Sequence, residues 1–172
     1  MPDILVRSEA RRDSAATRAV HEAAFPTQAE ANLVDMLRSL PGVSSWVAVI
    51  RGEVVAHALY TPVAVKGEDE DEPWAALALG PMAVLPAFQG QGVGSWLVQS
   101  SLRSCLADGH DVVFVLGHPD FYTKVGFRPA GPLGIRCTQP APDSHFMVAE
   151  LRPGAIGAMR GVVHYHQAFD TV

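Results

Sequence analysis

The sequence contains little lysine and little positive charge. Lys66 and Lys124 are its only lysines among 172 residues, and thirteen Lys and Arg stand against eighteen Asp and Glu, for a formal net charge of −5. A protein that binds nucleic acid needs clustered cations to neutralise phosphates. The charge balance therefore argues against nucleic acid as the main partner.

Cysteine is also scarce, and long hydrophobic runs are missing. Cys105 and Cys137 lack the spacing of a metal site and are too few for a disulfide framework, so we expect reduced thiols. No apolar run approaches the ~18 residues of a membrane-spanning helix, and charged residues stand near the N-terminus in place of a signal segment. We expect a cytoplasmic protein without a membrane partner.

Apolar surface, by contrast, is ample. Hydrophobic residues make up 48% of the chain and charged residues 18%, and the mean hydropathy is +0.14. This composition supports a packed core and argues against a disordered chain. The length fits one domain of ~100–200 residues, so we expect residues 1–172 to form a single domain.

Hydrophobic periodicity predicts alternating strands and helices, which is a mixed α/β fold class. Thr27 and Glu30 have the spacing of a capping box at the start of the second helix. Gly80-Pro81 predicts a bulge or a point of strand separation, because proline cannot donate to a central ladder. The expected strands cover 4–6, 46–50, 53–63, 74–84, 112–116, 146–151 and 162–165, and the expected helices cover 15–24, 29–40, the segment from the glycine loop to Gly109, and 119–125.

A glycine-rich loop joins the strand 74–84 to the helix that ends near Gly109, and it contains Gly90, Gly92 and Gly94. A strand, such a loop and a helix N-terminus direct several backbone N–H groups at one point, where the helix dipole also favours an anion. The pattern indicates a diphosphate cradle, with a glycine-rich turn that binds nothing as the alternative. The G-x-G-x-G spacing departs from the Rossmann fingerprint, and the lack of lysine in the loop excludes a Walker A motif.

Two motifs resemble one known family. Gln89-x-x-Gly92-x-Gly94, at the head of a helix and after a strand that ends MAVLP, resembles the acetyl-CoA loop of the GNAT superfamily of N-acetyltransferases. The segment 121–127, FYTKVGF, resembles the second signature of that superfamily, and it follows about 30 residues later, in the expected order. The pattern of the whole chain is similar to the YhbS-like branch of bacterial GNAT proteins.

This resemblance implies the GNAT, or acyl-CoA N-acyltransferase, fold, in which helices flank a mixed central sheet with splayed middle strands. It also implies acetyl-CoA as cosubstrate, no metal, and direct transfer of acetyl to a primary amine in a ternary complex. The acceptor amine stays unidentified. By position in the motif, the residues that bind acetyl-CoA are expected to be Met82, Ala83, Val84, Gln89, Gly90, Gln91, Gly92, Val93, Gly94 and Ser95.

Tyr122 matches the general acid of the family, which protonates the departing thiolate. The other interpretation makes Tyr122 a partly buried aromatic residue of the helix core, like its neighbours Phe121 and Val125. Both interpretations stay open at the level of sequence.

The general base is harder to assign. Better-known members of the family place a Glu or His on the strand before the loop, but the strand 74–84 carries no titratable side chain. His118, just after the strand 112–116, is the first candidate because histidine titrates near neutral pH. His118 would alternatively cap or orient the helix that starts at Pro119. Glu53, His57 and Asp120 are held in reserve.

Four further points stay open. The acidic run 68–72 either attracts a cationic amine or is only a solvated loop, and the segments 66–73 and 129–145 are expected to form the acceptor pocket together with the N-terminal helices. His164 and His166 alternate on a predicted strand, but without a third ligand they do not indicate a metal site.

The missing base leaves a second functional class, a non-catalytic GNAT-fold module that binds or senses acyl-CoA. Whether the protein forms a homodimer also stays open.

Overall fold

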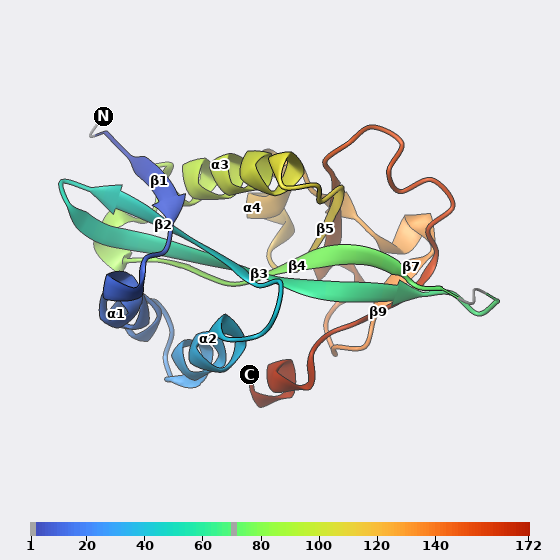
Figure 1. The fold of residues 1–172 in the computed structure, drawn as a ribbon, viewed down its shortest axis with the longest axis horizontal. Coiled ribbons are helices and arrows are strands. Elements are labelled where there is room, and N and C mark those ends of the chain that lie inside the picture. The colour runs from blue at the N-terminus through green and yellow to red at the C-terminus, as the bar shows by residue number, and fades with distance from the viewer. Residues whose placement is uncertain (1–2, 70–71) are drawn as a thin grey trace.

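The computed structural model describes residues 3–69 and 72–172, which build a nine-stranded mixed sheet with helices on both faces (Figure 1). The strand order is β1-β2-β3-β4-β5-β8-β6, and β9 pairs with β3 while β7 pairs with β9. The strands are β1 Leu5–Ser8, β2 Ser44–Ile50, β3 Glu53–Lys66, β4 Trp74–Val84, β5 Val112–Leu116, β6 Arg128–Pro129, β7 Ile135–Cys137, β8 Phe146–Glu150 and β9 Gly161–His164. The α-helices are α1 Ser14–Ala24, α2 Ala29–Arg38, α3 Val93–Ala107 and α4 Pro119–Tyr122.

The two middle strands of the sheet separate at their C-terminal ends. β4 and β5 pair in parallel only over Leu77–Leu79 and Val113–Val115. β4 then passes through Gly80-Pro81, where its register with β3 shifts, and continues beside β3 as far as Val84. Proline cannot donate to a ladder, so the sequence places the end of the β4–β5 pairing here. The splayed middle strands expected from the GNAT resemblance are confirmed.

Helices cover the two faces of the sheet in different ways. In Figure 1, α1, α2 and the C-terminal turn lie on one face, and α3 and α4 lie on the other. Leu97 and Val98 place α3 on the main core of the sheet. On the opposite face, Leu33 and Leu37 of α2 pack with Leu59 and with Phe169, which belongs to the 3₁₀ helix Gln167–Thr171. The C-terminal segment is thereby held against α2.

The predicted capping box at the start of α2 is wrong. The N-cap residue is Gln28, so Glu30 is the second residue of the helix, whereas a capping box needs Glu or Gln at the third. No side chain caps this end, and the Thr27 hydroxyl instead accepts a hydrogen bond from the Ala29 N–H at 3.3 Å. The side chain of Glu30 is therefore available for another role.

Other local differences follow from irregular backbone. β9 ends at His164, and the His166 side chain accepts a hydrogen bond from the Ala168 N–H, so the two histidines do not share a strand. The spacing of Val98, Leu102, Cys105 and Leu106 predicts one core face for α3, but Leu106 is 40% exposed. In the acidic run, Glu68 and Asp69 are exposed, while residues 70 and 71 lie outside the described residues.

Within the two described ranges, no helix is long and apolar enough to span a membrane.

Candidate active site

A cavity of about 900 Å³ opens where β4 and β5 separate. Its lining comes from the end of β4, the glycine loop, α4 and the segment that follows β5, and on the other side from α1, α2 and the C-terminal segment. Ten of the twelve residues predicted for the site line this cavity: Met82, Ala83, Val84, Gln89, Gly90, Gly92, Gly94, Ser95, His118 and Tyr122. The split in the sheet therefore brings the two sequence motifs to one place.

The glycine loop has the backbone that an anion cradle needs. Gly90 and Gly92 have φ angles of 72° and 84°, in the left-handed region that favours glycine, and Gly92 is the N-cap of α3. The first backbone hydrogen bond into the helix joins the Trp96 N–H to the Gly92 carbonyl at 3.0 Å. In the described part of the chain, the amides from Gly92 to Ser95 donate to no backbone carbonyl, so they remain available to a ligand.

Gly94 has a steric reason to be glycine. A Cβ at this position would lie 3.0 Å from Met82 Cε and 3.3 Å from Val84 Cγ2, so a side chain here would have to displace these two β4 side chains slightly. The remaining two predicted residues do not line the cavity: Val93 is buried in the core, and the Gln91 side chain donates to the Ala87 carbonyl at 2.9 Å. The Gln89 side chain donates to the Val84 carbonyl at 2.9 Å, which ties the loop to β4.

Tyr122 is held firmly at the cavity wall. Its ring makes edge-to-face contacts with Phe121 and Phe127, with centroids 4.8 Å and 5.4 Å apart. The ring also lies against Gly117, where a Cβ would overlap with it. Burial raises the pKa of the Tyr122 hydroxyl to about 12, and like other tyrosine hydroxyls it carries its proton at neutral pH. A buried, protonated hydroxyl at a cavity wall has the properties of a proton donor.

His118 lines the same cavity, at the start of the helix that ends at Tyr122. It is exposed, lines the cavity, and its ring centroid is 5.3 Å from that of His145, which also lines it. His118 is the N-cap residue of α4, but only its backbone carbonyl bonds to the helix, through the Phe121 and Tyr122 N–H groups at 3.1 Å. Its side chain makes no cap hydrogen bond, so the ring remains free for the cavity. The reserve candidates Glu53, His57 and Asp120 do not line the cavity.

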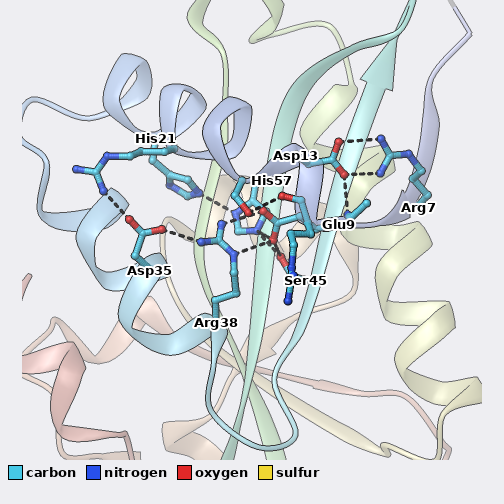
Figure 2. Close-up of polar contacts among 12 residues, drawn as sticks. Arg7, Glu9, Asp13, His21, Asp35, Arg38, Ser45 and His57 are labelled. Atoms are coloured by element: carbon cyan, nitrogen blue, oxygen red, sulfur yellow. Dashed lines mark hydrogen bonds and ion pairs between the residues drawn. The ribbon is translucent and has the colours of Figure 1, made fainter.

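His57 instead belongs to a buried polar network beside the cavity, drawn in Figure 2. Arg38 of α2 donates to Glu9 at 2.8 Å and 3.3 Å, and the Ser45 hydroxyl of β2 donates to the same carboxylate. His57 Nε2 lies 2.6 Å from Ser45 Oγ, and His57 Nδ1 lies 2.8 Å from His21 Nε2 of α1. The network therefore ties α1, α2, β2 and β3 to the residue that follows β1.

The direction of each hydrogen bond in this network follows from Glu9. Burial alone raises the pKa of Glu9, but its contacts with His57, Arg38 and Ser45 hold it well below its ordinary value, so the carboxylate only accepts. Ser45 must then donate to Glu9 and accept from His57 Nε2–H. His57 Nδ1 consequently accepts from His21 Nε2–H, which leaves His21 Nδ1 as a buried acceptor without a partner among the described residues.

The network also supports the cavity wall. His57 is opposite Ala83 in the pairing of β3 with β4, and Ala83 lines the cavity. The His21 ring stacks on Phe25, with centroids 6.0 Å apart and an interplanar angle of 9°, and Phe25 lines the cavity as well. Neither histidine touches the cavity directly. The network thus fixes the position of wall residues.

We expect acid to destabilise the protein through these two histidines. Burial lowers the pKa of His21 to about 3 and lowers that of His57. The unfolded chain, with histidine pKa near 6.5, binds more protons below that pH, so folding stability falls as pH falls from 6.5. At pH 5, His21 alone should cost about 2 kcal/mol, measured by urea unfolding at pH 7.5 and pH 5. Replacing the exposed His164 by Gln should leave this loss of stability unchanged. Equal stability at both pH values would contradict the lowered pKa values of His21 and His57.

Glu30 is a cavity residue that the sequence analysis missed. It lies in the first turn of α2, lines the cavity, and its Oε2 atom is buried without a hydrogen-bond partner among the described residues. The sequence pattern suggested a capping box and so assigned this side chain to the helix end. The helical period offered a better signal, because Glu30 lies three residues before the buried Leu33 and hence on the same face.

The acceptor pocket expected from the sequence is only partly right. The N-terminal helices and residues 139–141 and 145 do line the main cavity. The described part of the segment 66–73 does not: Lys66, Gly67, Glu68 and Asp69 line a separate cavity of about 520 Å³ with Arg136 and Arg160, at the far end of β3. Long β3 carries this loop away from the opening between β4 and β5, as Figure 1 shows.

The cysteines show no sign of nucleophilic activation. Burial raises the pKa of the Cys105 thiol to about 12, and burial also raises that of Cys137. Neither residue lines the main cavity. Across residues 3–69 and 72–172, no group of three or more His, Cys, Asp or Glu side chains is arranged to hold a metal ion.

Sequence comparison identifies relatives of the whole chain. Residues 41–129 match the acetyltransferase (GNAT) domain. The chain is 32% identical over 169 residues to the uncharacterized N-acetyltransferase YhbS of Escherichia coli K12, covering 97% of this chain and 99% of that protein. It is 37% identical over 139 residues to the uncharacterized N-acetyltransferase YjhQ of the same strain, covering 78% of this chain and 76% of that protein.

Solved structures agree with the sequence comparison. The crystal structure of E. coli YhbS in complex with CoA has a TM-score of 0.88 at 32% identity, covering 99% of this chain and 93% of that chain. A GNAT family acetyltransferase from Brucella melitensis in complex with acetyl-CoA has a TM-score of 0.76 at 30% identity, covering 99% of this chain and 100% of that chain.

The protein is an N-acetyltransferase by class. Its mixed sheet splays apart, and a glycine loop and a buried tyrosine line the opening. The domain match and the near full-length similarity to YhbS then give the family. The chain belongs to the GNAT acetyltransferase family.

Proposed function

We propose that the protein transfers acetyl from acetyl-CoA to a primary amine by direct attack in a ternary complex. The observation that carries this proposal is the single cavity lined by β4, the glycine loop and Tyr122. Two relatives support the choice of cosubstrate, because their structures contain CoA and acetyl-CoA. A test is steady release of free CoA when the protein is supplied with acetyl-CoA and a panel of primary amines.

Acetyl-CoA is held by backbone groups in this proposal. The N–H groups from Gln91 to Gly94 hold the diphosphate, with Gln89 and Ser95 at either side, and the backbone of Val84 pairs with the pantetheine arm. The open edge of β4 supports this arrangement, because β5 leaves β4 after Leu79. The negative net charge does not oppose it, since amide dipoles at contact distance outweigh distant, screened carboxylates.

The chemical step needs a neutral amine, a stabilised oxyanion and a proton for the departing thiolate. We assign the proton to the Tyr122 hydroxyl, which lines the cavity and carries its proton at neutral pH. A backbone N–H between Met82 and Val84 stabilises the oxyanion, and His118 accepts the proton of the amine. The exposed position of His118 at the cavity, without a cap hydrogen bond, supports this role.

The second candidate function is an acyl-CoA sensor without efficient catalysis. It is favoured by one observation, that in the described part of the chain β4 carries no titratable side chain at the cavity. A sensor would bind acetyl-CoA but would show no amine-dependent release of CoA.

We also propose that residues 1–172 act as one domain in the cytoplasm, which the continuous sheet and the two free thiols support.

We expect Gly92→Val to weaken acetyl-CoA binding at least tenfold, about 1.4 kcal/mol. A β-branched residue is strained at a φ of 84°, and its side chain would extend into the space of the diphosphate. Isothermal titration calorimetry measures the affinity. Gly109→Val is a matched control at the other end of α3, because it also has a positive φ and open space around the new Cβ. Affinity that falls equally in both variants, or in neither, would contradict the diphosphate site.

A further inference from the structure

Two buried polar atoms in the cavity wall lack a partner among the described residues. They are Glu30 Oε2 and the Tyr165 hydroxyl, and both residues line the main cavity. No Lys, Arg or His nitrogen of the described chain lies within the 4.0 Å of an ion pair with the Glu30 carboxylate. Leaving a buried polar group unpaired costs about 1–3 kcal/mol, and more for a charged group. Such groups therefore point to a missing hydrogen-bond partner.

The side of the cavity that carries Glu30 is mainly apolar. Phe25 from the end of α1 and Leu33 from the next turn of α2 line the same cavity. Phe169 lines it from the C-terminal segment and makes an edge-to-face contact with Tyr165, with centroids 5.0 Å apart. This apolar compartment is formed by the α1, α2 and C-terminal side of the cavity, across from the glycine loop.

We infer that Glu30 recognises the acceptor by binding the ammonium group of a primary amine whose remaining part is apolar. The inference rests on the proposed acetyl transfer and adds the class of its acceptor. A carboxylate without a cation in an apolar wall attracts a cation strongly, because charge-assisted hydrogen bonds are about twice as strong as neutral ones. The Tyr165 hydroxyl offers a second acceptor for an ammonium N–H. Phe25, Leu33 and Phe169 bury the apolar part.

This assignment separates binding from chemistry. Glu30 binds the protonated amine, which must lose one proton before its nitrogen attacks the thioester. His118 takes that proton in the proposed mechanism. When the tetrahedral intermediate collapses, the thiolate receives a proton from Tyr122, and the nitrogen gives up its second proton, which restores the Tyr122 hydroxyl. Glu30 is therefore a specificity-determining residue. For any apolar amine that the protein acetylates, Glu30→Gln should raise the KM of the amine at least tenfold and should leave kcat within about threefold.

The direct test is binding to the CoA-saturated protein, measured by calorimetry. The probes are 2-phenylethylamine and hexylamine, each paired with the alcohol of the same shape, 2-phenylethanol and 1-hexanol. We expect each amine to bind at least tenfold more tightly than its alcohol. Glu30→Gln should abolish this preference and leave CoA affinity unchanged. The matched control is Glu22→Gln, which removes the same charge from an exposed site on α1.

Each outcome decides the inference. It is overturned if neither amine binds more tightly than its alcohol, or if folded Glu30→Gln keeps the preference of the original protein. It is also overturned if Glu22→Gln removes the preference as fully, because general electrostatics would then explain it. Failure of the original protein to bind CoA would instead contradict the proposed function. Amine binding without release of CoA from acetyl-CoA would support the subsite but favour the sensor.

Discussion

Tyr122→Phe should lower the rate constant for acetyl transfer by ~100- to 10,000-fold, the usual contribution of a general acid. The ring that contacts Phe121, Phe127 and Gly117 is retained, so the packing of α4 should persist. The KM for acetyl-CoA should barely change, because the hydroxyl acts chiefly in the transition state. Steady-state kinetics with an amine that the protein acetylates would measure both constants.

The matched control for this change is Tyr60→Phe. Tyr60 is fully buried and its hydroxyl lies 2.7 Å from Ser101 Oγ, away from the cavity lining. Removing that hydroxyl should cost about 1 kcal/mol of stability, the usual net value of a hydrogen bond, and should leave turnover unchanged. A folded Tyr122→Phe protein with turnover within about threefold of the original would make Tyr122 a packing residue only.

The pH dependence gives a second signature of the acid. A CoA thiolate needs protonation less as pH rises, so the deficit of Tyr122→Phe should shrink at high pH. A packing defect has no reason to show this trend. A deficit that is constant across pH would therefore argue against proton donation even if the loss of rate were large.

Glu9→Gln should destabilise the fold by about 3 kcal/mol. Removing one partner of a buried ion pair usually costs 3–5 kcal/mol, and the low end applies because Arg38 keeps its 2.7 Å contact with Asp35. The Glu9 side chain is only 4% exposed, and it accepts from Ser45 as well as Arg38. For a protein of this size, the loss should lower the Tm by roughly 6–12 °C.

Asp111→Asn is the control for Glu9→Gln. It breaks the 2.9 Å ion pair with Arg152. The Asp111 side chain is 36% exposed and the Arg152 side chain 60%, and surface pairs contribute at most about 1 kcal/mol. Thermal unfolding of both variants, followed by circular dichroism, would compare them. If the two changes lowered the Tm equally, the buried network would have no special part in stability.

Much of the cavity lining was predictable because its signals are local. Gly90 and Gly92 take positive φ angles within a short loop, and α3 begins directly after Gly92. The amides proposed to bind the diphosphate therefore belong to consecutive residues. The spacing of Tyr122 and the loop motif carries the family resemblance in the same way. The GNAT fold and the splayed sheet were inferred from that resemblance, with Gly80-Pro81 as the local cause of the separation.

The positions of Glu30 and His57 were not predictable from local pattern. Glu30 has the spacing of a capping box, but the helix starts one residue later than that motif requires, and Glu30 lines the cavity instead. His57 stood among the reserve bases, yet it is fully buried between His21 and Ser45. Its surroundings come from α1 and β2, which only the folded chain brings together.

The sequence by itself determined the alternation of strands and helices, the glycine loop and the order of the two motifs, because each depends on backbone preferences and side-chain periodicity within a few residues. Only the tertiary structure decided which side chains share the cavity and which are buried in the Glu9 network. Burial, hydrogen-bond partners and pKa depend on residues such as Arg38 and Tyr165, which are distant in sequence from the groups they affect. Those properties arise from packing across the sheet, and no local pattern encodes them.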